Sequence, residues 1–333
     1  MEGLKFASLF LIGLILIVKG ADWLTDGASN IARRFNISSL VIGLTIVAFG
    51  TSAPELVVSV ISSLEDKADM AIGNVVGSNI FNSLAIMGIT ALIYPVSCSK
   101  NNVKIDVPLC VLAASFLFLF TYNCELFTNR DLFGLFDSKI SRIEGVSLLI
   151  CFLLFVIYSI YIGRKGPTSD SEISTSPSFQ EMPIWKSLLL FLIGLACLIF
   201  GGDWLVDGAS GIASLLGVSD SIIALTIVAA GTSFPELVTS VIAARKGDTD
   251  MALGNVVGSN VLNIFLVLGI ASTITPLPTG NLNSWNIIIQ LVASVLLWFF
   301  CFYGKKKYFI VRREGLMLTL CAIGYYVWTV VSH

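Results

Sequence analysis

The stretch Gly-Ala-Asp-Trp-Leu-Thr-Asp-Gly-Ala-Ser at residues 20–29 returns as Gly-Gly-Asp-Trp-Leu-Val-Asp-Gly-Ala-Ser at residues 201–210, 181 positions later. A second motif recurs at the same offset. Gly-Thr-Ser-Ala-Pro-Glu-Leu at residues 50–56 matches Gly-Thr-Ser-Phe-Pro-Glu-Leu at residues 231–237. Matched segments in fixed order and at fixed spacing indicate an internal duplication. The fold is therefore expected to consist of two copies of one unit.

A third motif, Gly-Asn-Val-Val-Gly-Ser-Asn, is identical at residues 73–79 and 254–260 and keeps the same offset. Each copy of the unit also carries one glutamate, Glu55 or Glu236, inside an otherwise apolar stretch. Duplication thus supplies two carboxylates to one molecule. We expect a single site to which both copies contribute.

Composition places this duplicated unit in a membrane. Hydrophobic residues make up 56% of the chain and charged residues only 13%, whereas soluble domains contain about 25% charged residues. A bilayer core about 30 Å thick needs about 20 apolar residues of helix. The predicted fold class is an all-α integral membrane protein with ten transmembrane helices. The predicted spans are residues 5–24, 38–63, 69–95, 105–122, 144–163, 186–206, 219–243, 250–276, 284–303 and 314–331.

Ten spans divide into two repeats of five, and an odd number of crossings turns the second repeat upside down. We expect residues 1–163 to form the first five-helix repeat, residues 164–185 a cytoplasmic linker, and residues 186–333 the inverted second repeat. Fourteen lysines and arginines fall in the loops of one side and five in those of the other. This bias predicts a multi-pass protein of the plasma (inner) membrane with both termini outside the cytoplasm.

Glu55 and Glu236 each follow a proline in the middle of a predicted span. A carboxylate at the bilayer centre costs at least about 2.5 kcal/mol, so it must face the protein interior and find a partner. Proline removes a backbone donor and frees carbonyls one turn earlier, near Gly50 and Thr51 in the first copy. Non-helical backbone at this depth persists only where it is buried in protein or lines a cavity. Such a set of oxygen atoms suits Ca²⁺ and Na⁺ rather than zinc or copper.

A simple proline kink, with the hydroxyls bonded back to their own helix, would explain one such motif. Two copies on opposite topologies, each with a glutamate at the same place, favour a binding site instead. The identical third motifs add polar side chains at four-residue steps, which lie on one helix face. We expect four of these side chains to face the ions: Ser78, Asn82, Ser259 and Asn263. The asparagines one turn earlier, Asn74 and Asn255, are expected to lie behind them.

Other features of the motifs have plainer interpretations. Paired glycines four residues apart, such as Gly254 and Gly258, would let helices approach closely. Four aspartates are predicted to lie at helix ends in the interfacial region rather than in the site: Asp22, Asp26, Asp203 and Asp207. The seven cysteines fall singly and form no disulfide or metal framework.

The paired Gly-Thr-Ser-x-Pro-Glu and Gly-Asn-Val-Val-Gly-Ser-Asn motifs resemble the two alpha-repeats of the calcium/cation antiporter superfamily, and most closely the sodium/calcium exchangers. The resemblance covers nearly the whole chain. It implies ten helices in inverted five-helix repeats. It also implies electrogenic exchange of external Na⁺ for internal Ca²⁺ by alternating access, with the first and sixth spans sliding against the other eight.

The same resemblance assigns roles to individual residues. It makes Glu55 and Glu236 the shared carboxylate ligands and gives backbone-carbonyl roles to Ala48 and Ala229. The hydroxyl or carbonyl ligands it implies are Thr51, Ser52, Thr232 and Ser233, and the ring is completed by Ser78, Asn82, Ser259 and Asn263.

The chain departs from the family pattern at one place. Sodium/calcium exchangers commonly carry an aspartate at the position of Asn263, opposite the asparagine that corresponds to Asn82, whereas this chain has asparagine at both. The site then holds at most two negative charges, which neutralise one Ca²⁺ but not three Na⁺. This departure leaves open the ion stoichiometry and the preferred divalent ion, and it disfavours coupling to K⁺.

Other functions fit parts of the pattern. A proton/calcium antiporter, or an antiporter for another divalent cation, is the main alternative, although such relatives often place a histidine beside the motif acid and the only histidine here is His333. A cation channel would also use carboxylates and broken helices. A non-transporting sensor is a third class of function. An ATP-driven pump is excluded, because the sequence contains no Gly-x-x-x-x-Gly-Lys-Ser/Thr motif for binding the nucleotide. We expect no enzyme activity, no cofactor, no nucleic acid and no obligate protein partner; Ca²⁺ and Na⁺ are the expected ligands and membrane lipid the surroundings.

Overall fold

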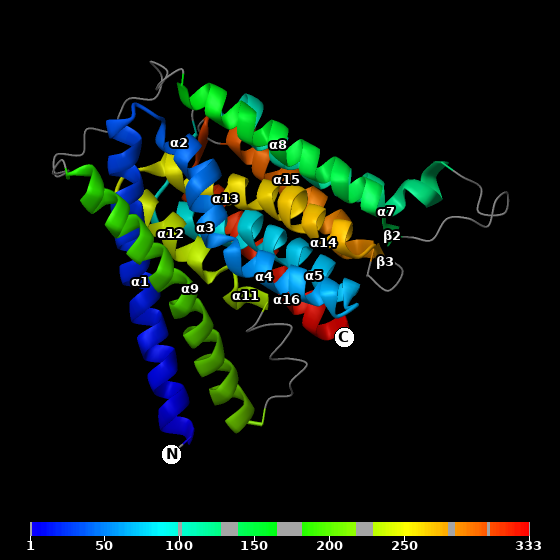
Figure 1. Ribbon diagram of the computed structural model, residues 1–333, viewed down its shortest axis with the longest axis horizontal. Helices are drawn as coiled ribbons and strands as arrows, with labels where there is room; N and C mark the ends of the chain where they lie inside the picture. The colour runs from blue at the N-terminus through cyan, green and yellow to red at the C-terminus, as the bar shows by residue number, and fades with distance from the viewer. Residues whose placement is uncertain are drawn as a thin grey trace.

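The computed structural model describes residues 2–98, 102–127, 139–164, 182–217, 229–278, 284–304 and 307–332. Within these ranges the chain is almost wholly helical (Figure 1). The first half contains α1 (Glu2–Arg34), α2 (Ser39–Ile42), η1 (Gly43–Val47), α3 (Ala48–Thr51), α4 (Ala53–Leu64), α5 (Ala68–Ile80), η2 (Phe81–Ile86), α6 (Met87–Ile93), β1 (Val96–Ser97), η3 (Asn102–Asp106), α7 (Val107–Phe127), β2 (Lys139–Ile140) and α8 (Arg142–Arg164). The second half contains α9 (Ile184–Leu215), α11 (Ala229–Gly231), α12 (Phe234–Arg245), α13 (Thr249–Leu262), η5 (Asn263–Leu268), α14 (Gly269–Ile274), β3 (Leu277–Pro278), α15 (Ser284–Tyr303), β4 (Phe309–Ile310) and α16 (Arg312–Ser332).

The described helices confirm an all-helical, multi-pass membrane protein. Seven are long and apolar enough to cross a bilayer, and the bent pair Ser39–Thr51 and Ala53–Leu64 makes eight. The predicted span 219–243 begins outside the described residues, and α16 is not among the eight. The count of ten therefore stays a prediction. Most of the predicted linker, residues 165–181, also lies outside the described residues.

The longest helices, α1 and α9, form an antiparallel pair at one side of the molecule (Figure 1). Glycines spaced by seven residues line the contact: Gly13, Gly20 and Gly27 on α1, and Gly194, Gly201 and Gly208 on α9. A Cβ atom added at Gly20 would lie 2.8 Å from the Gly194 carbonyl oxygen, so the two backbones touch directly. The contact is reciprocal, because each of these glycines has its counterpart 181 residues away on the partner helix.

The remaining helices form an inner bundle around the paired motifs. The segments from α5 to α6 and from α13 to α14 are its most buried spans. Gly254 and Gly258 on α13 allow the close approach that the sequence predicts, since a Cβ atom at Gly254 would lie 2.6 Å from the Leu40 carbonyl oxygen. Gly73 and Gly77 on α5 meet no described atom within 4 Å, so close packing at the first motif stays a prediction.

Two short antiparallel strand pairs join the halves of the chain. Strand β1 pairs with β4, where Val96 lies opposite Ile310, and β2 pairs with β3, where Ile140 lies opposite Leu277. β1 and β3 occupy equivalent positions in the two copies. Each copy therefore contributes one strand to both pairs, as reciprocal packing of two like units requires.

The predicted positions of the four aspartates need correction. Asp22 and Asp26 lie inside α1, which continues to Arg34, and Asp203 and Asp207 lie inside α9, which continues to Leu215. The hydropathy pattern falls off near residues 24 and 206, but the helices extend into a polar last third. On α1, Lys246 from the loop before α13 pairs with both aspartates and makes this polar stretch part of the packed structure.

Candidate ion-binding site

Each glutamate of the repeated motif begins a new helix. The ladder breaks at Ser52 (φ −85°, ψ 8°) and at Ser233 (φ −91°, ψ 5°), and the helices that follow start one residue before the motif prolines. Proline is tolerated in the first turn of a helix, where no backbone donor is needed. Glu55 and Glu236 therefore lie in the first turns of α4 and α12, where the helix dipole favours a negative charge. The break predicted at the prolines is confirmed, and at α4 the helix bends by 49°.

The two copies exchange hydrogen bonds across the site. The Ser52 hydroxyl donates to Oε1 of Glu236 at 3.0 Å, and the Ser233 hydroxyl donates to Oε1 of Glu55 at 3.1 Å. These are equivalent positions, so one interaction is repeated with the copies exchanged. All four side chains are buried, and both glutamates are 0% exposed. Residues about 180 positions apart thus form one compact cluster.

The first asparagine of each identical motif lies behind its glutamate. Asn74 donates to the Glu55 carbonyl oxygen at 3.2 Å and to the Ser59 hydroxyl at 2.9 Å. Asn255 donates to the Glu236 carbonyl oxygen at 3.3 Å and to Ser240 at 3.0 Å. These bonds hold the first turns of α4 and α12, which agrees with the supporting position expected for both asparagines.

Within the part of the chain that the structure describes, several buried oxygen atoms near this cluster have no hydrogen-bond partner. Buried polar atoms are normally paired, so each exception calls for an explanation. The unpartnered oxygens on predicted site residues are Oε2 of Glu55, Oε2 of Glu236, Oδ1 of Asn82, Oδ1 of Asn263, Oγ of Ser259 and Oγ1 of Thr232. All are oxygen atoms of the kind that hard cations bind, and two of them belong to glutamate side chains, which are negatively charged when ionised.

The remaining predicted site residues lie as follows. Ser78 donates to Oε1 of Glu55 at 3.5 Å, which brings α5 to the first glutamate. Thr51 donates to Oδ1 of Asn255 at 3.1 Å and to the Ala48 carbonyl at 3.4 Å. That carbonyl also accepts a bond from the Ser52 amide at 2.9 Å. Ala229 starts α11, and its side chain lies outside the described part of the chain.

The structure also brings in residues to which the sequence argument gave no role. Asn79 donates to the Asn260 carbonyl oxygen at 3.2 Å and accepts a bond from Asn263 at 3.0 Å, while Asn260 donates to Ser83 at 2.8 Å. The signal was available, because Asn79 and Asn260 end the identical motifs. A helical wheel alone does not show that they face the opposite copy.

Asn82 and Asn263 lie in π-helical turns, η2 and η5. Such turns widen a helix by one residue per turn and are frequent at functional sites. Asn82 and Asn263 are equivalent residues, so each copy places an amide side chain in a π-helical turn. Together with the glutamates they place two carboxyl groups among neutral amide and hydroxyl oxygens, and such a set of oxygen atoms is able to coordinate a cation.

Comparisons with known proteins match both halves of the chain. The family model described as "Sodium/calcium exchanger protein" matches residues 5–161 and 186–331. The chain is 33% identical over 341 residues to the sodium/calcium exchanger MaX1 of Methanosarcina acetivorans, with 96% of this chain and 97% of that protein covered. It is 31% identical over 336 residues to the inner membrane protein YrbG of Escherichia coli, with 98% and 96% covered. A solved structure of the sodium-calcium exchanger NCX_Mj matches with a TM-score of 0.80 at 33% identity, with 99% of both chains covered.

Proposed function

Because the chain belongs to the sodium/calcium exchanger protein family, we propose that it is a secondary antiporter that exchanges Ca²⁺ for Na⁺ across the membrane. Membership in this family makes it a membrane transporter for cations rather than an enzyme. The finer proposal concerns the coupling ion, the alternating exposure of one midplane site, and the residues that form this site.

The observation that carries the proposal is the reciprocal pair of serine–glutamate bonds. Ser52 reaches Glu236 and Ser233 reaches Glu55, so the two carboxylates belong to one cluster and not to two separate sites. Two close, buried carboxylates repel each other when the site is empty. Either Ca²⁺ or Na⁺ relieves this repulsion. Because both ions need the same oxygens, they exclude each other, and this competition produces exchange.

In this proposal Glu55 and Glu236 are the charged ligands in both ion-bound states. The neutral ligands come from both copies: Ala48, Thr51, Ser52, Ser78 and Asn82 from the first, and Ala229, Thr232, Ser233, Ser259 and Asn263 from the second. The unpartnered oxygens of Asn82, Asn263, Ser259 and Thr232 support this set, since a bound cation would satisfy each of them.

The architecture we propose is two inverted five-helix repeats, residues 1–163 and 186–333, joined by a cytoplasmic linker at 164–185. The reciprocal glycine contacts of α1 with α9 and the exchanged strand pairs support it. Inverted repeats place equivalent residues around an axis in the membrane plane, with the site at the bilayer midplane. The lysine and arginine distribution supports termini outside the cytoplasm.

Two glutamates without a third carboxylate give the site a charge of −2 when both are ionised. This charge balances one Ca²⁺ or two Na⁺, and a third Na⁺ would leave an uncompensated buried charge. We therefore propose that this chain moves fewer than three Na⁺ per Ca²⁺. A proton on either glutamate is the competing way to reset the site, which makes proton coupling the alternative to be tested.

The test is ⁴⁵Ca²⁺ uptake into proteoliposomes under an imposed gradient of Na⁺, K⁺ or H⁺. We expect uptake to follow the outward Na⁺ gradient and to stop in Glu55→Gln and Glu236→Gln. Glu2→Gln, at the exposed start of α1, is the matched control and keeps its activity. Uptake that follows only the H⁺ gradient would replace Na⁺ with H⁺ as the coupling ion. Uptake without any counter-ion gradient would indicate a channel.

A further inference from the structure

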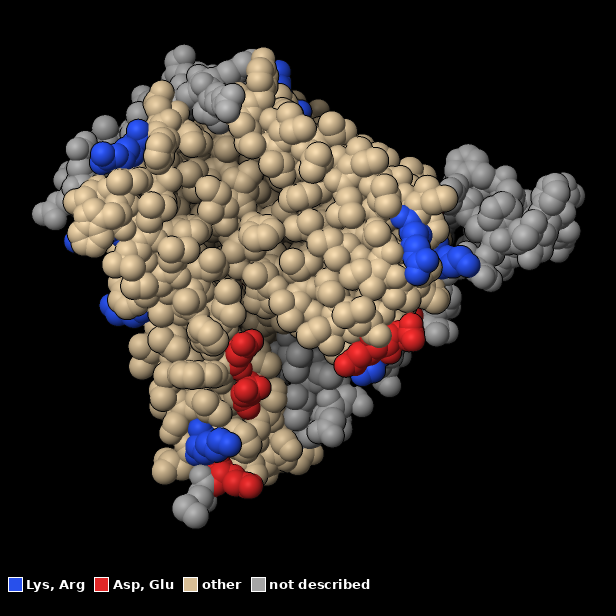
Figure 2. Space-filling model, in the orientation of Figure 1, with Lys and Arg blue, Asp and Glu red and all other residues tan. Residues whose placement is uncertain are grey.

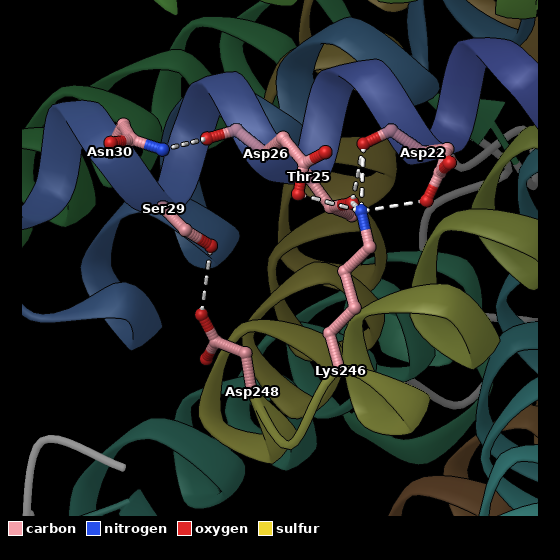
Figure 3. Close-up of polar contacts among 7 residues, drawn as sticks. All are labelled: Asp22, Thr25, Asp26, Ser29, Asn30, Lys246 and Asp248. Atoms are coloured by element: carbon pink, nitrogen blue, oxygen red, sulfur yellow. Dashed lines mark hydrogen bonds and ion pairs between the residues drawn. The ribbon is translucent and has the colours of Figure 1, made fainter. Parts of the chain in front are cut away.

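Lys246 lies in the loop between α12 and α13, and its ammonium group reaches into α1 (Figure 3). It donates to the Asp22 carbonyl oxygen at 2.9 Å and to the Thr25 hydroxyl at 3.0 Å. It also pairs with the Asp22 carboxylate at 2.7 Å and with the Asp26 carboxylate at 2.8 Å. One lysine thus connects an inner helix pair to four oxygens on a single face of α1.

A second contact fastens the same loop to α1. The Ser29 hydroxyl, one turn beyond Asp26, donates to Oδ2 of Asp248 at 3.1 Å (Figure 3). The other oxygen of Asp248 accepts the Met251 amide at 3.1 Å and caps α13. The loop is therefore held to α1 at two points and also fixes the start of the helix that carries Asn255, a residue behind Glu236. Movement of α1 away from this end must break both contacts.

The equivalent place in the other copy has the opposite charge. The residue 181 positions before Lys246 is Glu65, while the aspartates of α1 recur on α9 as Asp203 and Asp207. At one end of the molecule a lysine meets two aspartates, and at the other end the counterpart of that lysine is an acid. Glu65 is exposed and pairs with Lys67 of its own loop at 2.7 Å instead.

The packing of the helices also differs between the two ends of the molecule. α1 packs along α12, whereas the equivalent contact, between α9 and α4, is at most marginal although both helices are fully described. Asp203 and Asp207 lie on α9 and Glu65 lies directly after α4, and Figure 2 shows two separate groups of acidic side chains on this face of the molecule. Like charges in this arrangement oppose closure, because they repel as the helices approach.

We propose that Lys246 is a latch that closes one entrance to the ion site, and that Glu65 leaves the matching entrance at the other end unlatched. This inference rests on the proposed antiport, in which α1 and α9 slide against the other helices. Lys246 is a positioning residue in this account and does not touch the transported ions. With the termini outside the cytoplasm, the latch closes the cytoplasmic entrance, so the carrier rests with its site open to the outside.

The test measures distances between spin labels in lipid nanodiscs, in a cysteine-free background without Na⁺ or Ca²⁺. One label pair, at positions 34 and 245, reports on the latched end, and its counterpart at positions 215 and 64 reports on the other end. We expect Lys246→Gln to lengthen the 34/245 distance and to lower the ratio of closed to open molecules by roughly tenfold. Lys246→Arg retains the closed distance. Lys104→Gln, at an exposed lysine of η3, is the matched surface control and leaves this distance unchanged.

The decisive variant adds an interaction rather than removing one. Glu65→Lys places a lysine opposite Asp203 and Asp207, and we expect it to shorten the 64/215 distance and shift the population toward closure of that end. The proposal is overturned if the 34/245 distribution is the same in wild type, Lys246→Gln and Lys246→Glu. It is also overturned if Glu65→Lys leaves the 64/215 distribution unchanged.

Failure of the latch and failure of the antiport are distinguishable, because the distances are measured without ions. Unchanged distances in a protein that takes up ⁴⁵Ca²⁺ under a Na⁺ gradient refute the latch alone. Shifted distances in a protein that ignores the Na⁺ gradient refute sodium coupling and retain the latch.

Discussion

The two copies match at the proposed ion site but differ at the two ends of the molecule where α1 and α9 meet the inner helices. At the site the copies match, because Ser52 with Glu236 repeats Ser233 with Glu55. At the ends they differ in charge, because Lys246-Gly247-Asp248 stands where the other copy has Glu65-Asp66-Lys67. A site that must accept ions from both sides gains from equal halves. Entrances that must open in turn need a bias, and the difference in charge between the two loops can supply one.

Removing one of the two glutamates is expected to have the largest effect on Ca²⁺ binding and to test whether the two copies contribute equally. Glu55→Gln and Glu236→Gln each leave a Ca²⁺ ion opposite a single carboxylate, and uncompensated buried charge costs about 3–5 kcal/mol. We expect Ca²⁺ affinity to fall by at least about 100-fold in both variants. Isothermal titration calorimetry on purified protein measures this loss. If one variant keeps wild-type affinity, the halves are not equivalent.

The two asparagines of the π-helical turns sharpen the comparison, because their surroundings differ. Neither polar atom of Asn82 has a hydrogen-bond partner among the described residues, whereas Asn263 donates to Asn79 at 3.0 Å. An aspartate at either position adds a third negative charge. We expect Asn82→Asp to raise Ca²⁺ affinity by about tenfold, since affinity follows the ligand charge count.

Asn263→Asp should gain less, because the new carboxylate loses the donor to Asn79 and faces its oxygen. The same titration compares the two variants, and Asn82→Ala and Asn263→Ala control for loss of the amide. Equal gains in Ca²⁺ affinity would show that the hydrogen bond between Asn263 and Asn79 does not affect Ca²⁺ binding.

The smallest expected effect concerns the bonds between copies. Ser52→Ala removes the donor to Glu236, and Ser233→Ala removes the donor to Glu55. The bound cation compensates part of the lost hydrogen bond to the glutamate. We therefore expect each substitution to weaken Ca²⁺ binding by only about 1 kcal/mol. We expect affinity to fall about fivefold in each single variant. Ser63→Ala, which removes a buried hydroxyl bonded to the Ala271 carbonyl away from the site, serves as the control and keeps its Ca²⁺ affinity.

Much of this molecule could be predicted from sequence because duplication repeats every informative signal. The family, the membrane location and the proline breaks before Glu55 and Glu236 are confirmed, since each depends on local chemistry that a motif displays directly. The ten-span inverted architecture and the ligand set stay predictions. The described contacts between the two copies are consistent with both of these predictions.

What sequence could not provide depends on contacts between the copies. The end of α1 was placed too early, because hydropathy falls at residues whose partner, Lys246, lies more than 200 positions away. The bonds of Asn79 and Asn260 escaped notice for the same reason. Residues of one helix face are visible in a periodic pattern, whereas the choice of partner across an interface is not.

The most direct test of the central claim, that the two copies build one shared site, is the stoichiometry of Ca²⁺ binding at equilibrium. Titration of the purified wild-type protein should give one Ca²⁺ per chain, and Glu55→Gln or Glu236→Gln alone should abolish that binding. Two Ca²⁺ per chain in the wild type, with one retained in each single variant, would show two separate sites and contradict the account.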